Sequence, residues 1–208
     1  MPVIALEAGC AVGCSGVAVA LARAGFRQLD EHGQRIGWIV SATIGAGGGI
    51  AAAAVEHRVS DGGRWVVLSA LTVWAVALGA AAGCDVVSKR IPTGLVRTAA
   101  ATTLVLLICA ASLSNDWHRL LVAVLAAVAC YAALIAARVG RGDTRLGFLG
   151  ALGIGAVGPR GAIIGAVALC LALLVQVIVT VVRGGDRHSR IAFGPALATG
   201  FIVAAASP

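Results

Sequence analysis

Two aspartates have the positions and neighbours needed for acid–base chemistry or ion coupling. Asp85 lies in the stretch 83–92 and Asp143 in the stretch 140–147, each where a long apolar run meets a short basic loop. Acidic side chains at a membrane edge are costly, and those that are present usually serve a function. We therefore expect Asp85 and Asp143 to form the active site.

Two carboxyl groups suffice for peptide hydrolysis. An ionised carboxylate activates water, and a protonated carboxyl polarises the carbonyl of the peptide bond. Two carboxyl groups held close together adopt these different states because they share one proton. Gly140 and Gly142 remove side-chain bulk around Asp143, which would let an extended substrate backbone approach. Pro92 follows Asp85 and lacks an N–H, so it can set the start of the next helix. This chemistry requires no metal or other cofactor.

The same residues are compatible with other roles when they are considered alone. A Gly-x-Gly-Asp tetrapeptide could serve catalysis, could bind a proton or cation during transport, or could be a structural loop. The six cysteines form no Cys-x-x-Cys pair, and no neighbouring side chains complete a metal site around them. We expect no metal and no cofactor.

The composition indicates the elements that must hold the aspartates. Apolar residues make up 60% of the 208 residues and charged residues 12%, against about 45–50% and about 25% in a soluble domain. A spanning helix needs about 20 residues, so the chain has room for roughly six to eight of them and for little else. Polar breaks are too widely spaced for strand alternation. We expect a single all-α membrane domain over residues 1–208.

The apolar runs predict about eight transmembrane helices. They cover residues 3–22, 37–55, 65–83, 95–113, 120–137, 147–157, 161–182 and 191–206. The sixth is short: even extended to 144–158 it covers only about 22 Å, against roughly 30 Å of hydrocarbon. It either crosses a thinned region or re-enters the membrane from one side.

Charge placement predicts the orientation. With eight spans, 12 of the 16 basic residues fall on the side of the Asp85 and Asp143 loops and 4 fall on the other side. Basic residues in short loops concentrate in the cytoplasm, so both aspartates should face the cytoplasm and both termini should lie outside. Orientation and anionic lipid account for the net charge of +7. We expect membrane lipid as a partner and no nucleic acid.

Glycine is abundant, with 28 residues. The patterns Gly45-x-x-x-Gly49 and Gly79-x-x-x-Gly83 permit two helix backbones to approach closely. In a glycine-rich chain such spacing is frequent. It predicts packing between helices of this chain and specifies no particular oligomer.

Three stretches together resemble the prepilin peptidase family, the aspartic membrane proteases that process type IV pilins and related secretion pseudopilins. They are Asp85 followed by Arg90-Ile91-Pro92, then Gly140-x-Gly142-Asp143-x-Arg145-Leu146, then Ala192-Phe193-Gly194-Pro195-Ala196-Leu197. They occur in the order and spacing of the family, from about residue 70 to the C-terminus. The resemblance implies a multi-span helical peptidase in which Asp85 and Asp143 are catalytic at the cytoplasmic side.

Departures from the family pattern refine this expectation. Arg145 stands where Lys is common, which implies a substrate-positioning or electrostatic role for its positive charge. Residues 23–36 replace a longer cysteine-containing insertion, so the chain resembles the short, peptidase-only form without N-methyltransferase activity. Ala192 stands where a proline is often found. We expect Gly194-Pro195 to break the eighth helix and to border the active-site cavity.

The expected substrate is a prepilin or pseudopilin precursor with a basic cytoplasmic leader and an apolar membrane helix. Its scissile bond would lie near the cytoplasmic face of the inner membrane. Other Gly-x-Gly-Asp membrane proteases, including preflagellin peptidases, share the aspartate chemistry, but the Ile-Pro and Phe-Gly-Pro motifs favour prepilins. The alternatives are a small proton- or cation-coupled transporter and a non-catalytic pilus-assembly subunit.

Overall fold

A computed structural model describes residues 2–26, 31–56, 63–88, 91–157, 159–182 and 193–206. Within these ranges every regular element is an α-helix, which confirms the all-α prediction. The helices are α1 (Pro2–Phe26), α2 (Glu31–Glu56), α3 (Arg64–Ser88), α4 (Thr93–Ser114), α5 (Trp117–Ala136), α6 (Arg141–Gly155), α7 (Pro159–Val182) and α8 (Phe193–Ala206).

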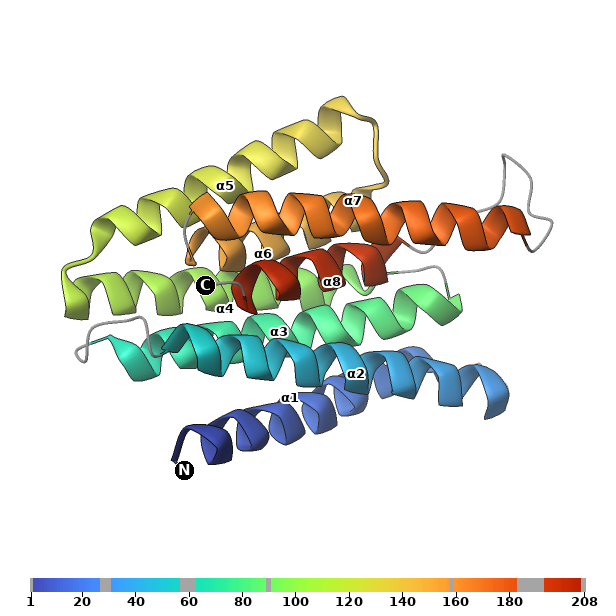
Figure 1. Ribbon diagram of the computed structural model, residues 1–208, viewed down its shortest axis with the longest axis horizontal. Helices are drawn as coiled ribbons and strands as arrows, with labels where there is room; N and C mark the ends of the chain where they lie inside the picture. Colours follow the sequence, from blue (N-terminus) through green and yellow to red (C-terminus); the bar gives the residue numbers. More distant parts are fainter. Residues whose placement is uncertain are drawn as a thin grey trace.

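Successive helices run in opposite directions along the long axis of the molecule (Figure 1). The start of α1 and the end of α8 therefore lie toward the same end. The opposite end gathers the C-terminal end of α3 and the N-terminal ends of α4, α6 and α8 (right in Figure 1). We call this the aspartate end, because α3 and α6 carry Asp85 and Asp143 there.

The central helix is α3, which contacts α1, α2, α4, α6 and α8. Its side chains are apolar on every face, as expected of a helix surrounded by others. Leu71, Trp74 and Leu78 are fully buried. The buried residues continue along α3 as far as Asp85. The neighbouring helices therefore enclose the Asp85 carboxylate.

Close packing at glycines brings α1, α2 and α3 together. A Cβ added at Gly45 would lie 2.9 Å from a backbone oxygen of α1, and Gly49 also abuts the α1 backbone. Gly79 and Gly83 of α3 face the backbone of α2 in the same way. The predicted contacts of both Gly-x-x-x-Gly patterns are confirmed as contacts within this chain.

The short helix α6 is packed through glycines on several sides. Gly150 lies against the ring of Phe201 in α8, and Gly153 lies against Trp74 in α3. The helix is buried along most of its 15 residues. At 1.5 Å per residue it is about 22 Å long, so its predicted shortness is confirmed.

Within the part of the chain that the structure describes, four helices are long and apolar enough to cross a membrane. These segments are Gln34–Ala53, Arg64–Ser88, Thr93–Ser114 and Trp117–Ala136. Shorter apolar helical segments are Ala8–Arg23, Ile163–Val179 and Gly194–Ala204. Many large apolar side chains of α5 and α7 are exposed on the outside of the bundle, among them Leu125 and Leu171 at 58% each. Such an exterior indicates a membrane protein.

Candidate active site

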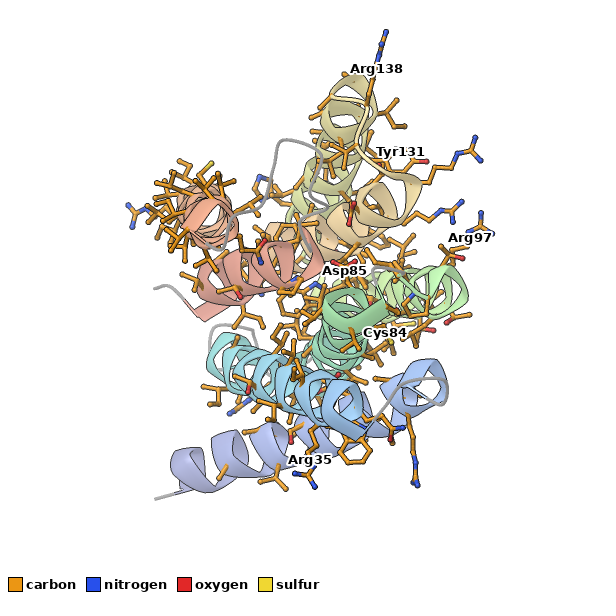
Figure 2. The ribbon with its side chains drawn as sticks, turned by 90° about the vertical axis from the view of Figure 1, so that its right-hand side faces the viewer. Arg35, Cys84, Asp85, Arg97, Tyr131 and Arg138 are labelled. Atoms are coloured by element: carbon orange, nitrogen blue, oxygen red, sulfur yellow. The ribbon has the colours of Figure 1, made fainter. Side chains whose placement is uncertain are left out.

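Asp85 is a buried carboxylate within α3, with 6% of its surface exposed. The sequence placed it at the start of a loop, but the helix continues through it to Ser88. The Ser88 hydroxyl donates to the Cys84 carbonyl at 2.6 Å, which supports the last turn. Helical geometry therefore fixes the direction of the Asp85 side chain, which lies near the middle of the aspartate end (Figure 2).

The carboxylate of Asp85 accepts a hydrogen bond from the backbone N–H of Gly194 at 2.8 Å. A Cβ at residue 194 would lie 3.0 Å from the same carboxylate oxygen and 3.1 Å from the Asp85 Cβ. These distances are too short for an unperturbed alanine. Glycine at this position therefore permits the contact between α3 and α8.

The expectation that Gly194-Pro195 breaks the eighth helix is wrong. Helix α8 begins at Phe193 and continues through Gly194 and Pro195, which lie in its first turn. Proline is tolerated there because the first N–H groups of a helix have no partner within it. The N–H of the buried Gly194 is one of those groups, and it donates to Asp85.

Asp143 lies in the first turn of α6, whereas the sequence placed it in a loop. Gly140 is the N-cap residue, and its carbonyl accepts from the Thr144 N–H and from the Thr144 hydroxyl, both at 3.0 Å. The Asp143 carboxylate turns back toward this cap, since a Cβ at Gly140 would lie 3.3 Å from its Oδ2. The Gly-x-Gly-Asp motif is thus the start of a helix.

Ile91 and Pro92 lie between α3 and α4. Pro92 is the N-cap of α4, and its carbonyl accepts from the Val96 N–H at 3.2 Å. This confirms that Pro92 sets the start of the fourth helix. A Cβ at Gly142 would lie 3.3 Å from the Cβ of Ile91. Ile91, which follows α3 in the chain, therefore packs against the glycine next to Asp143.

The two aspartates interact electrostatically. Burial, and to a lesser extent the negative charge of Asp85, together raise the pKa of Asp143 to about 6. The α6 N-terminus opposes this effect through its dipole, worth about 0.3–1 kcal/mol. A directed hydrogen bond to a charged group, such as the one Asp85 accepts, is worth about 1.5–3 kcal/mol. The surroundings of the two carboxylates are therefore unequal.

Arg145 lies in a different hollow from the aspartates. A space of about 250 Å³ between α4, α5 and α6 is lined by Arg145, Arg97, Tyr131 and Phe148, with two small apolar residues. The Tyr131 and Phe148 rings meet edge to face at 6.0 Å. Arg35, Arg97 and Arg138 point outward around the periphery of the aspartate end (Figure 2). These three arginines place positive charge around this end.

A larger apolar groove of about 700 Å³ runs between α1, α3 and α4. Its lining includes Cys10, Cys14, Val73 and Leu95, and it contains neither Asp85 nor Asp143. The groove has no acid–base pair of its own. The candidate acid–base pair therefore lies outside this groove, at the aspartate end.

Two supporting residues were missed from the sequence. Thr144 is buried, and its hydroxyl donates a hydrogen bond to the Gly140 carbonyl. The Ile91 side chain packs against Gly142. Thr144 directly follows Asp143, so a hydroxyl that bonds one turn back was a detectable signal. No local signal connects Ile91 with Gly142, because the two residues belong to different elements.

Some residues of the three motifs lie outside the described residues. These are Arg90 of the first stretch and Ala192 of the third. Residues 27–30 and 183–192 also lie outside the described ranges. The geometry of the site therefore rests on Asp85, Asp143 and the glycines around them.

Comparison of the chain with protein-family models, with curated proteins and with solved structures found no match. The functional argument accordingly rests on the residues and on their arrangement.

Proposed function

We propose that this protein is a membrane aspartic endopeptidase that cleaves the leader peptide of type IV prepilin-like or pseudopilin precursors. The observation that carries the proposal is the meeting of three distant stretches at one end of the bundle. Asp85 contacts Gly194 directly, and its charge acts on Asp143. The same three stretches carry the resemblance to prepilin peptidases.

The proposed orientation places the aspartate end at the cytoplasmic face of the inner membrane. All eight helices would cross or enter the bilayer, with both termini on the outer side. The arginines around the aspartate end support this orientation, since basic residues concentrate on the cytoplasmic side and attract anionic lipid. A substrate with a basic leader and an apolar helix would present its scissile bond at this depth.

The proposed reaction uses water and two carboxyl groups. The ionised carboxylate accepts a proton from water as the water oxygen attacks the scissile carbonyl carbon, and the protonated carboxyl donates to the carbonyl oxygen. We assign no metal and no cofactor to these steps. Since residues 23–36 are too few for a cysteine-containing insertion, the proposal does not include N-methylation of the product.

Co-expression with a candidate prepilin tests the proposal. The wild type should produce one defined cut, seen in the size and the N-terminal sequence of the product. Asp85→Asn and Asp143→Asn should each lower the cleavage rate by about 10²–10⁴-fold, the usual contribution of general acid–base catalysis. Both variants should still be found in the membrane.

Asp116→Asn is the matched control. Asp116 caps α5 by accepting from the Arg119 N–H and pairs with the Arg119 guanidinium at 3.0 Å. Asparagine also caps helices well, and the α4–α5 connection lies at the end of the bundle away from Asp85 (Figure 1). This variant should cleave as the wild type does. Full activity in either dyad variant would exclude the proposed mechanism.

A proton-coupled transporter is the second candidate. The observation that favours it is the pKa of about 6 for Asp143, because a carboxyl that titrates near neutral pH can exchange protons under physiological conditions. Proton flux into liposomes that contain the wild type, and its loss in Asp143→Asn, would support transport. In that case an added prepilin should remain uncut and the flux should continue. Binding of a prepilin without cleavage or flux would instead indicate a pilus-assembly subunit.

A further inference from the structure

The two aspartates differ in a way that assigns their roles, given the peptidase activity proposed above. Asp85 is held by a backbone donor from a helix N-terminus, and Asp143 is not. We propose that Gly194 is a positioning residue whose N–H keeps Asp85 ionised as the base that activates water, while Asp143 is the protonated acid.

Asp85 is the more buried of the two carboxyl groups, with 6% of its surface exposed, and burial alone favours the neutral form. The assignment therefore requires the hydrogen bond and the helix terminus at Asp85 to outweigh its burial. The Gly194 N–H donates to its Oδ2 at 2.8 Å, and a donor to a carboxylate stabilises the ionised form. This N–H belongs to the first turn of α8, where the helix dipole adds a positive potential. Because a Cβ at residue 194 would lie 3.0 Å from Oδ2, only glycine lets the backbone come this close without displacement.

The environment of Asp143 favours the neutral carboxyl. Within the described residues its carboxylate accepts no hydrogen bond, and its near neighbour is the Gly140 position. Burial and the charge of Asp85 raise its pKa to about 6. A proton shared by the pair therefore resides on Asp143, where the substrate carbonyl can accept a hydrogen bond from it.

Within the described ranges, the other polar and charged groups near the pair do not act on Asp143 against this assignment. Cys84 feels the charge of Asp85, but its thiol faces α1, 3.8 Å from the Ala22 carbonyl oxygen. From α4 and α6, Arg97 and Arg145 line the separate hollow beside Tyr131. From α2, Gly37 and Ser41 face α3 at Gly83 and carry no charge.

The steps balance with these roles. Asp85 takes a proton from water as the water oxygen bonds to the carbonyl carbon, and Asp143 gives its proton to the carbonyl oxygen, which forms a neutral gem-diol. Asp85 then passes its proton to the amide nitrogen as the C–N bond breaks. Asp143 recovers a proton from a diol hydroxyl. The products are a carboxylic acid and an amine, and both aspartates return to their starting states.

Infrared titration tests the assignment without a substrate. The purified wild type in detergent should show a protonated-carboxyl stretch that disappears as the pH rises through about 6. The band should be absent at this pH in Asp143→Asn. In Asp85→Asn the band should still be present at acid pH. It should disappear at a lower pH than in the wild type, because the neighbouring negative charge that raises the pKa of Asp143 has been removed. A band that survives in Asp143→Asn and vanishes in Asp85→Asn would overturn the assignment.

The pH profile of prepilin cleavage tests the role of Gly194. In Gly194→Ala the acid limb of kcat/KM should move to higher pH by about one unit, the effect of losing one hydrogen bond to a charged group. Gly94→Ala is the matched control, because a Cβ there meets no atom within 4 Å, and it should keep the wild-type profile. An unchanged acid limb, or a shift of the alkaline limb alone, would overturn the role of Gly194.

The two experiments separate the possible failures. If the wild type cleaves no prepilin, the peptidase proposal fails, yet the infrared titration still reports which carboxyl holds the proton. If cleavage is observed and the titration assigns the proton to Asp85, the peptidase stands and the assignment fails. If Gly194→Ala does not fold, the titration of the two Asn variants decides the assignment.

Discussion

Asp85 and Asp143 are the same residue type at the same end of the bundle, but they are held differently. Asp85 is inside a long central helix, 6% exposed, and accepts a hydrogen bond from the backbone of α8. Asp143 is half-buried in the first turn of a short helix, and the Ile91 side chain packs against its neighbour Gly142. The backbone of another helix binds the Asp85 carboxylate, whereas an apolar side chain makes the contact beside Asp143.

Glycine has a different purpose beside each of these two carboxylates. Gly194 lets a backbone donor reach a carboxylate, so an added methyl group would collide with the Asp85 carboxylate itself. Gly142 packs against Ile91, so an added methyl group there would press on an apolar side chain instead. We therefore expect substitutions around Asp143 to have effects of different sizes.

The largest of these effects is expected for Gly142→Ala. The new Cβ would lie 3.3 Å from the Ile91 Cβ, so α6 or Ile91 must shift slightly next to Asp143. Because a misplacement of about 1 Å can cost about 10²-fold, we expect a loss of roughly 3- to 10-fold in kcat/KM for prepilin cleavage. Ile91→Val, which removes one of the contacting carbons, should restore part of the loss. A loss that is the same with or without Ile91→Val would show that the two residues are not coupled.

The pH dependence of stability should come from Asp143. Its pKa in the folded protein, about 6, exceeds the value of about 3.9 expected in the unfolded chain. The unfolded state therefore releases this proton first, and the contribution of Asp143 to stability falls as the pH rises from about 4 to about 6. Thermal unfolding in detergent should show that Asp143→Asn loses this component, whereas Asp116→Asn retains it. An Asp143→Asn protein with the wild-type pH dependence would contradict the burial argument.

The smallest effect is expected for Arg145→Lys. Arg145 lines the hollow beside Arg97 and Tyr131, and lysine retains the charge while losing the planar guanidinium. We expect kcat/KM to change by less than about threefold, the scale of a partly exposed charge. Arg145→Ala measured beside it separates charge from shape. A loss as large as that of the dyad variants would move Arg145 into the catalytic machinery.

The helices and the candidate residues could be predicted from the sequence because their signals are local. Long apolar runs, the Pro92 boundary and the short segment before residue 158 identify the helices of the described chain to within a few residues. The exceptions are the start of α2 at Glu31, well before the run predicted from residue 37, and the helical ends beyond Asp85 and around Asp143. Those ends were missed because polar and glycine residues resemble a loop when their tertiary contacts are unknown. The number of helices that fully cross the membrane stays a prediction beyond the four long ones.

The sequence by itself determined which residues could do chemistry: two aspartates at the ends of apolar segments, with glycines beside them. Only the tertiary structure decided that Gly194 donates to Asp85 across 109 residues of chain, that Ile91 faces Gly142, and that Arg145 points to a separate hollow. The reason is physical. Helix formation depends on residues within a few positions, whereas the choice of donor for a buried carboxylate depends on how whole helices pack against one another.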